Sequence, residues 1–179
     1  MYVFLSVEVP DLYPWVLLQV GVISFQCIVI GFGAGAKRKE FFDGSVKVKD
    51  KYNEQHKATY IRDIPKGGYP DMGDGRFGQE LTYKQWRAFQ LDQRGHKNFL
   101  EQVAMIVFFQ LVIGFMWPVV ALVFGFIHFV CRFIFVYGYK YGPKWRMLGG
   151  MPINILVMVS CVLSLVATSL LTYEVFEAL

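Results

Sequence analysis

A short polar segment at the start of a long apolar run carries the residues that are best equipped for chemistry. In QRGHKNFLE, residues 93–101, Arg94, Asn98 and Glu101 precede a stretch that is apolar enough to lie in lipid. On a helix that turns about 100° per residue, these three side chains and Arg87 fall within one stripe about 60° wide. Polar groups in a membrane segment are costly, and they usually face the bundle interior or a wet cavity. The stripe is therefore a candidate site.

A second polar stripe follows on the next predicted helix, in HFVCRFIFVYGYKY, residues 128–141. With Arg132 as the reference, His128, Phe135 and Tyr139 lie within about 60° of it. Arg146 comes shortly after this helix. Both stripes point toward the same end of the bundle.

The charges of the two stripes favour an anionic ligand. Arg94, Arg132 and Arg146 face one obvious carboxylate, Glu101, and the planar fork of arginine suits carboxylate recognition. A ligand with carboxylates and one ammonium group would use both the arginines and Glu101. The alternative is purely structural: Arg94 and Glu101 form an ion pair, Asn98 joins helices, and Arg132 extends to the headgroups.

The elements that position these residues are predicted to be transmembrane helices. The chain is 55% hydrophobic with a mean hydropathy of +0.38, and its apolar residues cluster in residues 12–36, 103–131 and 151–173. A helix needs about 20 such residues to cross a bilayer, so the middle run is too long for one span. Since proline favours a helix start, Trp117-Pro118 predicts a tight turn there. We expect an all-α membrane protein of one domain, residues 1–179, whose four-helix bundle spans residues 12–36, 96–116, 118–140 and 151–173.

A long polar insertion, residues 37–80, separates the first two predicted spans. Residues 37–98 hold 14 of the 18 Lys and Arg residues and 9 of the 14 acids. The short basic connection from Lys140 to Gly150 falls at the same end, so the positive-inside rule predicts both termini on the non-cytoplasmic or non-matrix side. Glycines and prolines between Pro65 and Gly78 predict turns, and the second long helix is expected to begin near Leu81. The N-terminus lacks a basic region before its apolar run, so we expect the first helix to be retained.

Several other patterns predict no chemistry. The basic residues are typical of positive-inside loops, so nucleic-acid binding is not expected. Cys27, Cys131 and Cys161 are far apart within predicted spans, which disfavours a disulfide framework or a C-x-x-C metal site, and no metal is expected. GFGAGA, residues 31–36, lacks phosphate-loop spacing, and Gly31 and Gly35 are better explained by helix packing. DMGDG, residues 71–75, is expected to be a turn.

Two segments resemble the MAPEG superfamily, the membrane-associated proteins of eicosanoid and glutathione metabolism. QRGHKNFLE is similar to the family's second-helix pattern Arg-x-x-x-Asn-x-x-Glu, and CRFIFVYGYKYGPKWRMLGG, residues 131–150, is similar to its third helix, Gly-Pro turn and later arginine. Within the superfamily, these segments look like the branch of microsomal glutathione S-transferase type 3. Phe135 stands where relatives often carry tyrosine. Gln102 replaces an aromatic residue of the leukotriene-forming branch, which disfavours that activity.

The resemblance implies a homotrimer that binds glutathione between subunits. It assigns Arg94, Asn98, Glu101 and Tyr139 to glutathione binding, gives Arg146 the stabilisation of the thiolate, and adds Arg38, or its neighbour Lys37, from the end of the first helix. The charge argument adds Arg132 to the glutathione-binding set. A thiol with a pKa of about 8.5 is mostly protonated at neutral pH. Lowering that pKa by about two units takes roughly 2.7 kcal/mol, which one guanidinium in a low-dielectric cleft can supply.

Two functions remain open at this point. The first is a membrane glutathione transferase or peroxidase, in which the thiolate attacks a lipophilic electrophile or lipid hydroperoxide that arrives from the bilayer. The second is a non-catalytic accessory subunit of a larger membrane complex, such as a mitochondrial respiratory assembly, with the insertion as a docking element. The expected location is correspondingly the endoplasmic reticulum or a mitochondrial membrane.

Overall fold

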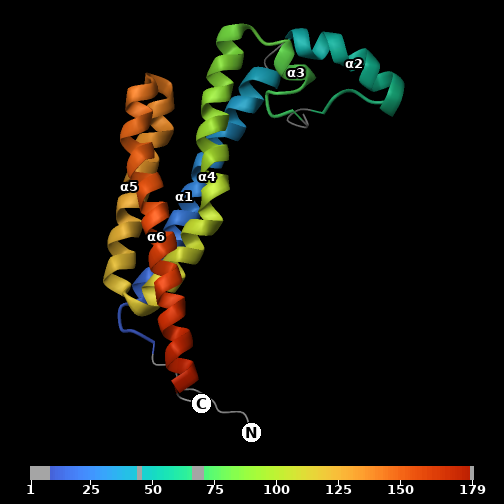
Figure 1. Ribbon diagram of the computed structural model, residues 1–179. Helices are drawn as coiled ribbons and strands as arrows, with labels where there is room; N and C mark the ends of the chain where they lie inside the picture. Colours follow the sequence, from blue (N-terminus) through green and yellow to red (C-terminus); the bar gives the residue numbers. More distant parts are fainter. Residues whose placement is uncertain (1–8, 44–45, 66–70, 178–179) are drawn as a thin grey trace.

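Four long helices form the body of the molecule in the computed structural model, which describes residues 9–43, 46–65 and 71–177 (Figure 1). They are α1 (Tyr13–Asp43), α4 (Tyr83–Met116), α5 (Pro118–Tyr141) and α6 (Pro143–Glu177). Each is long and apolar enough to cross a membrane. The predicted all-α fold with four membrane-spanning helices is confirmed.

The break between α4 and α5 lies where the sequence predicted it. Met116 ends α4, Trp117 is the single connecting residue, and Pro118 is the first residue of α5. Proline has no backbone N–H to lose at that position, and its fixed φ suits a helix start. Trp117 N donates to Ile113 O at 2.6 Å, which closes the last turn of α4.

The last helix begins earlier than predicted. Gly142, with φ +135°, ends α5, and Pro143 starts α6 immediately afterwards. The basic stretch before residue 151 is therefore helical rather than a loop, and Pro152 lies inside α6. Hydropathy locates where a chain enters lipid, but helices continue past that boundary, as α1 also does by extending to Asp43.

Helices α4 and α5 each pack against all the other long helices, with α1 and α6 beside them. Two glutamines join α1 to α5: Gln19 Nε2 donates to Leu122 O and Gln26 Nε2 donates to Phe129 O, both at 2.8 Å. The pairs are spaced seven residues apart on both helices. Without water to replace such bonds in a hydrocarbon layer, these side chains fix the axial position of α1 on α5.

A close approach between α1 and α4 explains one of the two glycines assigned to helix packing. A Cβ added at Gly31 would lie 2.7 Å from His96 Nε2, whereas one at Gly35 would meet nothing within 4 Å. Within the described chain, the packing prediction is confirmed for Gly31, whereas Gly35 faces open space.

The insertion, residues 37–80, folds against the start of α4 and has a small core of its own. It contains α2 (Val46–Tyr60) and α3 (Arg76–Gln79), which lie at one end of the bundle, called here the insertion end (Figure 1). The core consists of buried Phe42, Ile64, Leu81 and Phe89, with Phe41, Tyr52 and Phe77 packed on it. Four of these seven residues come from outside the α1 and α4 helices, so the insertion is anchored by apolar burial.

Two local devices shape the junction between the insertion and α4. Asp71 is buried and accepts four backbone N–H groups, from Gly73, Gly75, Phe77 and Gly78 at 2.6–3.1 Å. Thr82 and Gln85 form a capping box at the start of α4, two residues after the predicted start. The turn predicted at DMGDG is confirmed, while residues 66–70 of the predicted turn region lie outside the described residues.

Candidate functional site

Four of the predicted site residues line one groove at the insertion end. Arg94, Asn98 and Glu101 from α4 face Tyr139 from α5 across a hollow of about 320 Å³. Asn98 and Tyr139 are partly buried, and Arg94 and Glu101 are exposed at the rim. The other lining residues are Asp74, Gln90 and Lys97. The two polar stripes expected from helical spacing therefore meet.

Arg132 lies beneath this groove and does not line it. The side chain is fully buried, which rules out the alternative in which it extends to the headgroups. Its guanidinium donates to Asn98 Oδ1 (3.0 Å) and to Gln102 Oε1 (2.6 Å). It also stacks on Phe99 at 4.4 Å from the ring centroid. Because Arg132 occupies the oxygen of the Asn98 amide, the amide nitrogen remains as the donor toward a ligand.

His128 supports Arg132 from one turn earlier on α5. Its Nε2 lies 3.3 Å from a terminal nitrogen of Arg132. A guanidinium only donates, so Nε2 accepts and the imidazole is neutral with its proton on Nδ1. His128 Nδ1 is buried without a partner in the described structure.

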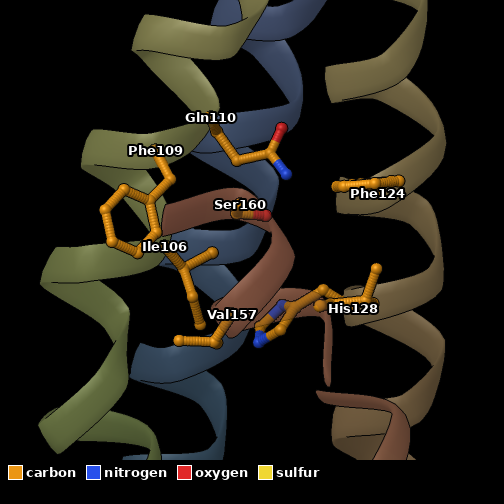
Figure 2. A pocket seen from close by; sticks show the side chains of 8 residues that line it. Ile106, Phe109, Gln110, Phe124, His128, Val157 and Ser160 are labelled. Atoms are coloured by element: carbon orange, nitrogen blue, oxygen red, sulfur yellow. The ribbon is translucent and has the colours of Figure 1, made fainter. Parts of the chain in front are cut away.

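A small, mostly apolar cavity lies beside His128 in the middle of the bundle. Its polar lining residues are His128, Ser160 and Gln110, and its volume of about 10 Å³ is near the least that holds one water molecule (Figure 2). In Figure 2, His128 from α5 and Gln110 from α4 approach this space from different helices, with Ser160 of α6 between them. Polar groups thus run from the groove through Asn98, Arg132 and His128 toward the bundle centre.

Arg146 lies beside the groove, above Tyr139. Its guanidinium carbon is 5.1 Å from the centroid of the Tyr139 ring, and its side chain is partly buried. The backbone explains this position: a Cβ added at Gly138 would lie 2.7 Å from Arg146 N. Only glycine at 138 lets the start of α6 approach α5 this closely, and that approach brings Arg146 to the tyrosine.

Arg38 does not reach the groove of its own chain. It is partly buried near the end of α1, where one of its terminal nitrogens contacts Met72 Sδ at 3.4 Å. Its neighbour Lys37 pairs with Glu40 at 2.6 Å. The predicted site set therefore divides into four groove residues, an adjacent Arg146, a buried Arg132 and a remote Arg38.

The structural alternative for Arg94 and Glu101 also fails. Among the described residues, no ion pair joins Arg94 to Glu101. Arg87, which shares the stripe by angle, lies nearer the start of α4 and lines a different groove with Lys84 and Asp92.

Asp74 brings an acid from the insertion into the groove, and sequence reasoning missed it. It accepts hydrogen bonds from Gln90 Nε2 (2.9 Å) and Lys97 Nζ (3.0 Å). The hydrogen bond from Lys97 is the main cause that lowers the pKa of Asp74, with Gln90 and the charge of Arg94 adding to it. Its carboxylate is thus held in the charged form at the mouth of the groove.

The other site residues that the sequence did not lead us to predict differ in how they could have been found. Gln90 and Lys97 lie within about 60° of Arg94 by the same helical arithmetic that identified the stripe, so spacing alone could have found them. Gln102, at about 80°, points toward α5 and was considered only as a departure from relatives. Asp74 comes from a segment whose position depends on long-range packing, and nothing in its local sequence indicated the groove.

Fold and groove together define a class: a four-helix membrane protein with a polar groove between two of its helices at one end, lined by two cations and two acids. A model of the MAPEG family matches residues 12–168, and the chain belongs to this family. A comparison with curated proteins finds no match. The recognition of the superfamily from residues 93–101 and 131–150 is confirmed.

Proposed function

We propose that the protein is a membrane glutathione transferase or peroxidase of the microsomal glutathione S-transferase type 3 kind. The observation that carries this proposal is the convergence of Arg94, Asn98, Glu101 and Tyr139 on one groove, with Arg146 next to Tyr139. Glutathione carries two carboxylates, one ammonium group and a thiol. The cations and the amide donor of the groove suit the carboxylates, and its acids suit the ammonium group. The neighbouring guanidinium of Arg146 suits the thiolate.

The buried residues give the groove a fixed geometry. Arg132 holds the Asn98 amide by its oxygen and is itself held by Gln102 and His128. We assign Arg132 to positioning Asn98 rather than to direct contact with glutathione. A polar group that is already oriented pays less conformational entropy when a ligand binds.

The chemistry follows from the thiol. Arg146 would stabilise the thiolate, whose sulfur forms a bond to an electrophilic carbon while the leaving group departs with its electron pair. With a lipid hydroperoxide, the thiolate attacks the outer oxygen and the O–O bond breaks, so that a glutathione sulfenic acid forms and the departing alkoxide takes a proton to become an alcohol. A second glutathione then reacts with the sulfenic acid to give the disulfide and water. The apolar helices deliver a lipophilic substrate from the bilayer, because only such compounds concentrate there.

Binding of glutathione to the purified protein tests this proposal directly. We expect the ultraviolet absorbance of a thiolate to appear when glutathione is added near neutral pH, together with a rise in melting temperature. S-methyl glutathione, which has no ionisable thiol, should raise the melting temperature without the absorbance. Absence of both signals from the glutathione sample would contradict the proposal.

A second function, as an accessory subunit of a larger membrane complex, is favoured by one feature of the insertion. At the end of α2, Tyr60 is 61% exposed and Ile61 is 94% exposed, and Ile61 has a φ of +57°. A β-branched residue rarely adopts this conformation, so an exposed isoleucine held there suggests a contact with another protein. Replacing Tyr60 and Ile61 by Ser and Gly should then release co-purifying proteins while glutathione binding is retained. An unchanged set of co-purifying proteins would remove this second function.

A further inference from the structure

The surface between α1 and α5 contains a series of hollows that do not belong to the glutathione groove. In the half of the bundle away from the insertion end, an apolar hollow of about 400 Å³ lies between Trp15 and Val22 of α1 and Leu122 and Phe126 of α5. Further toward the insertion end, a crevice of about 120 Å³ lies between α1 residues including Gly33 and the same face of α5. We call this line of hollows the α1–α5 seam.

A basic groove adjoins the seam at the insertion end. This groove has a volume of about 560 Å³ and is lined by Lys37, Lys84, Arg87 and Lys140, with one acid, Asp92. The crevice and the groove share Asp92 and Lys140 as lining residues, so they are neighbours. A cationic groove thus adjoins an apolar crevice between two membrane-spanning helices, and the larger apolar hollow lies further along the same pair of helices.

The cations of this groove are only partly neutralised. Asp92 bonds to Lys140 at 3.0 Å, and Lys37 bonds to Glu40 at 2.6 Å. Lys84 and Arg87 are exposed and take part in no ion pair with any residue that the structure describes. Basic pockets between transmembrane helices attract anionic headgroups, and arginine binds phosphate by two parallel hydrogen bonds.

We propose that the α1–α5 seam binds an anionic phospholipid. Its phosphate lies among Lys84, Arg87 and Lys140, and an acyl chain follows the crevice past Gly33. Gly33 lies one helical turn from Lys37, so the crevice begins directly below the cations. A Cβ added at Gly33 would meet nothing within 4 Å, which leaves the space beside this residue open to a hydrocarbon chain.

This lipid site is separate from the proposed glutathione site. The glutathione groove uses Tyr139, whereas the basic groove uses Lys140, and consecutive residues of a helix point about 100° apart. No residue lines both grooves in the part of the chain that the structure describes. Failure of one proposal therefore leaves the other standing.

Native mass spectrometry of the full-length protein tests the headgroup part of the proposal. The protein is exchanged into detergent with phosphatidylglycerol, with phosphatidylcholine, or with inorganic phosphate alone. We expect retention of phosphatidylglycerol in preference to phosphatidylcholine, and roughly tenfold weaker retention in the double variant Lys84→Gln/Arg87→Gln. The control Lys39→Gln/Lys144→Gln removes the same charge from exposed positions at the same end and should behave as the wild type. Equal retention of both lipids, or an effect of the control as large as that of the test variant, would overturn the proposal.

A second pair of variants tests the acyl chain and its competitors. Gly33→Leu fills the crevice and should reduce phosphatidylglycerol retention at least fivefold, whereas Gly35→Leu, at a glycine outside the lining of the seam, should not. If inorganic phosphate stabilised the protein as well as the lipid does, the site would be a headgroup site only and the lipid assignment would fail. If Gly33→Leu changed the mass of the oligomer and left lipid retention intact, a second copy of the chain would be the occupant and the proposal would be wrong.

Discussion

Arg146 and the groove residues have separable roles in the proposed reaction, because Arg146 lies over Tyr139 rather than among the lining residues. We therefore expect Arg146→Ala to lower kcat by more than about tenfold while glutathione affinity barely changes. Steady-state kinetics and a direct binding measurement distinguish the two quantities. Lys144→Ala, an exposed change in the same first turn of α6, is the matched control. Equal losses of kcat and affinity in Arg146→Ala would remove its assigned role.

Arg132 should act on glutathione only through Asn98. Arg132→Lys removes the planar fork, so Asn98 and Gln102 cannot both keep their bonds, and leaving a buried polar group unpaired costs about 1–3 kcal/mol. We expect weaker glutathione binding in Arg132→Lys, and almost no additional weakening when Arg132→Lys is introduced into Asn98→Ala.

A double-mutant cycle on the glutathione Kd measures this coupling. Additive effects would show that Arg132 contacts the ligand independently. If Arg132→Lys fails to fold, Gln102→Leu removes one of its two amide partners and tests the same connection.

The angular spacing of residues on a helix was sufficient to predict the groove residues of α4 but not to predict the position of Arg132. It grouped Arg94, Asn98 and Glu101 correctly because all three belong to one regular helix. It could not decide between an exposed and a buried Arg132, since that depends on the depth at which α5 packs against α4. The fully buried guanidinium, bound by two amide oxygens, is a tertiary feature that the sequence of α5 alone does not contain.

At the scale of the elements, the contact between the insertion and α4 should depend on pH through Asp74. Its pKa lies below the usual value because the charged form is hydrogen-bonded by Lys97. A carboxylate with a lowered pKa in the folded state contributes its stabilisation fully above about pH 4, its ordinary pKa. That contribution is lost as the pH falls through the lower, folded-state value.

Hydrogen exchange of residues 71–79 measured from pH 6 down to pH 3 tests this dependence. We expect the wild type to lose protection in this segment only at the acid end of the range. Asp74→Asn should lack the additional loss, because its side chain does not titrate. Glu54→Gln, at an exposed acid on α2, is the control. Identical profiles for the wild type and Asp74→Asn would contradict the role of this contact.

Helix boundaries were predicted correctly where a residue restricts the backbone itself. They were placed wrongly where the prediction relied on hydropathy. Pro118 marked the start of α5 because proline restricts the backbone itself. Hydropathy placed the fourth span at residues 151–173, whereas α6 runs from Pro143 to Glu177. The T-x-x-Q pattern at Thr82 would have located the start of α4 to the residue, since a capping box satisfies backbone donors that only a helix start leaves free.

At the scale of the whole molecule, the remoteness of Arg38 gives the proposed trimer a specific test. If Arg38 serves the groove of a neighbouring subunit, mixed oligomers of Arg38→Ala and Arg146→Ala chains contain some complete sites. We expect such mixtures to recover part of the activity that each variant lacks alone. Mixtures of Arg94→Ala and Arg146→Ala, whose defects fall in the same groove, should recover none. No recovery in the first mixture would show that Arg38 has no role in a neighbouring site.

The single residue that links α4 to α5 has a consequence for the distant groove. Because Trp117 alone connects the two helices, the link has no slack, and adding or deleting one residue there would shift α5 against α4. Such a shift would disturb the contacts of Arg132 with Asn98 and Gln102, although these lie several turns from the link. The length of this connection is thus constrained although it touches no ligand. An alanine inserted beside Trp117 should disturb the positions of the groove residues more than any substitution of Trp117 itself.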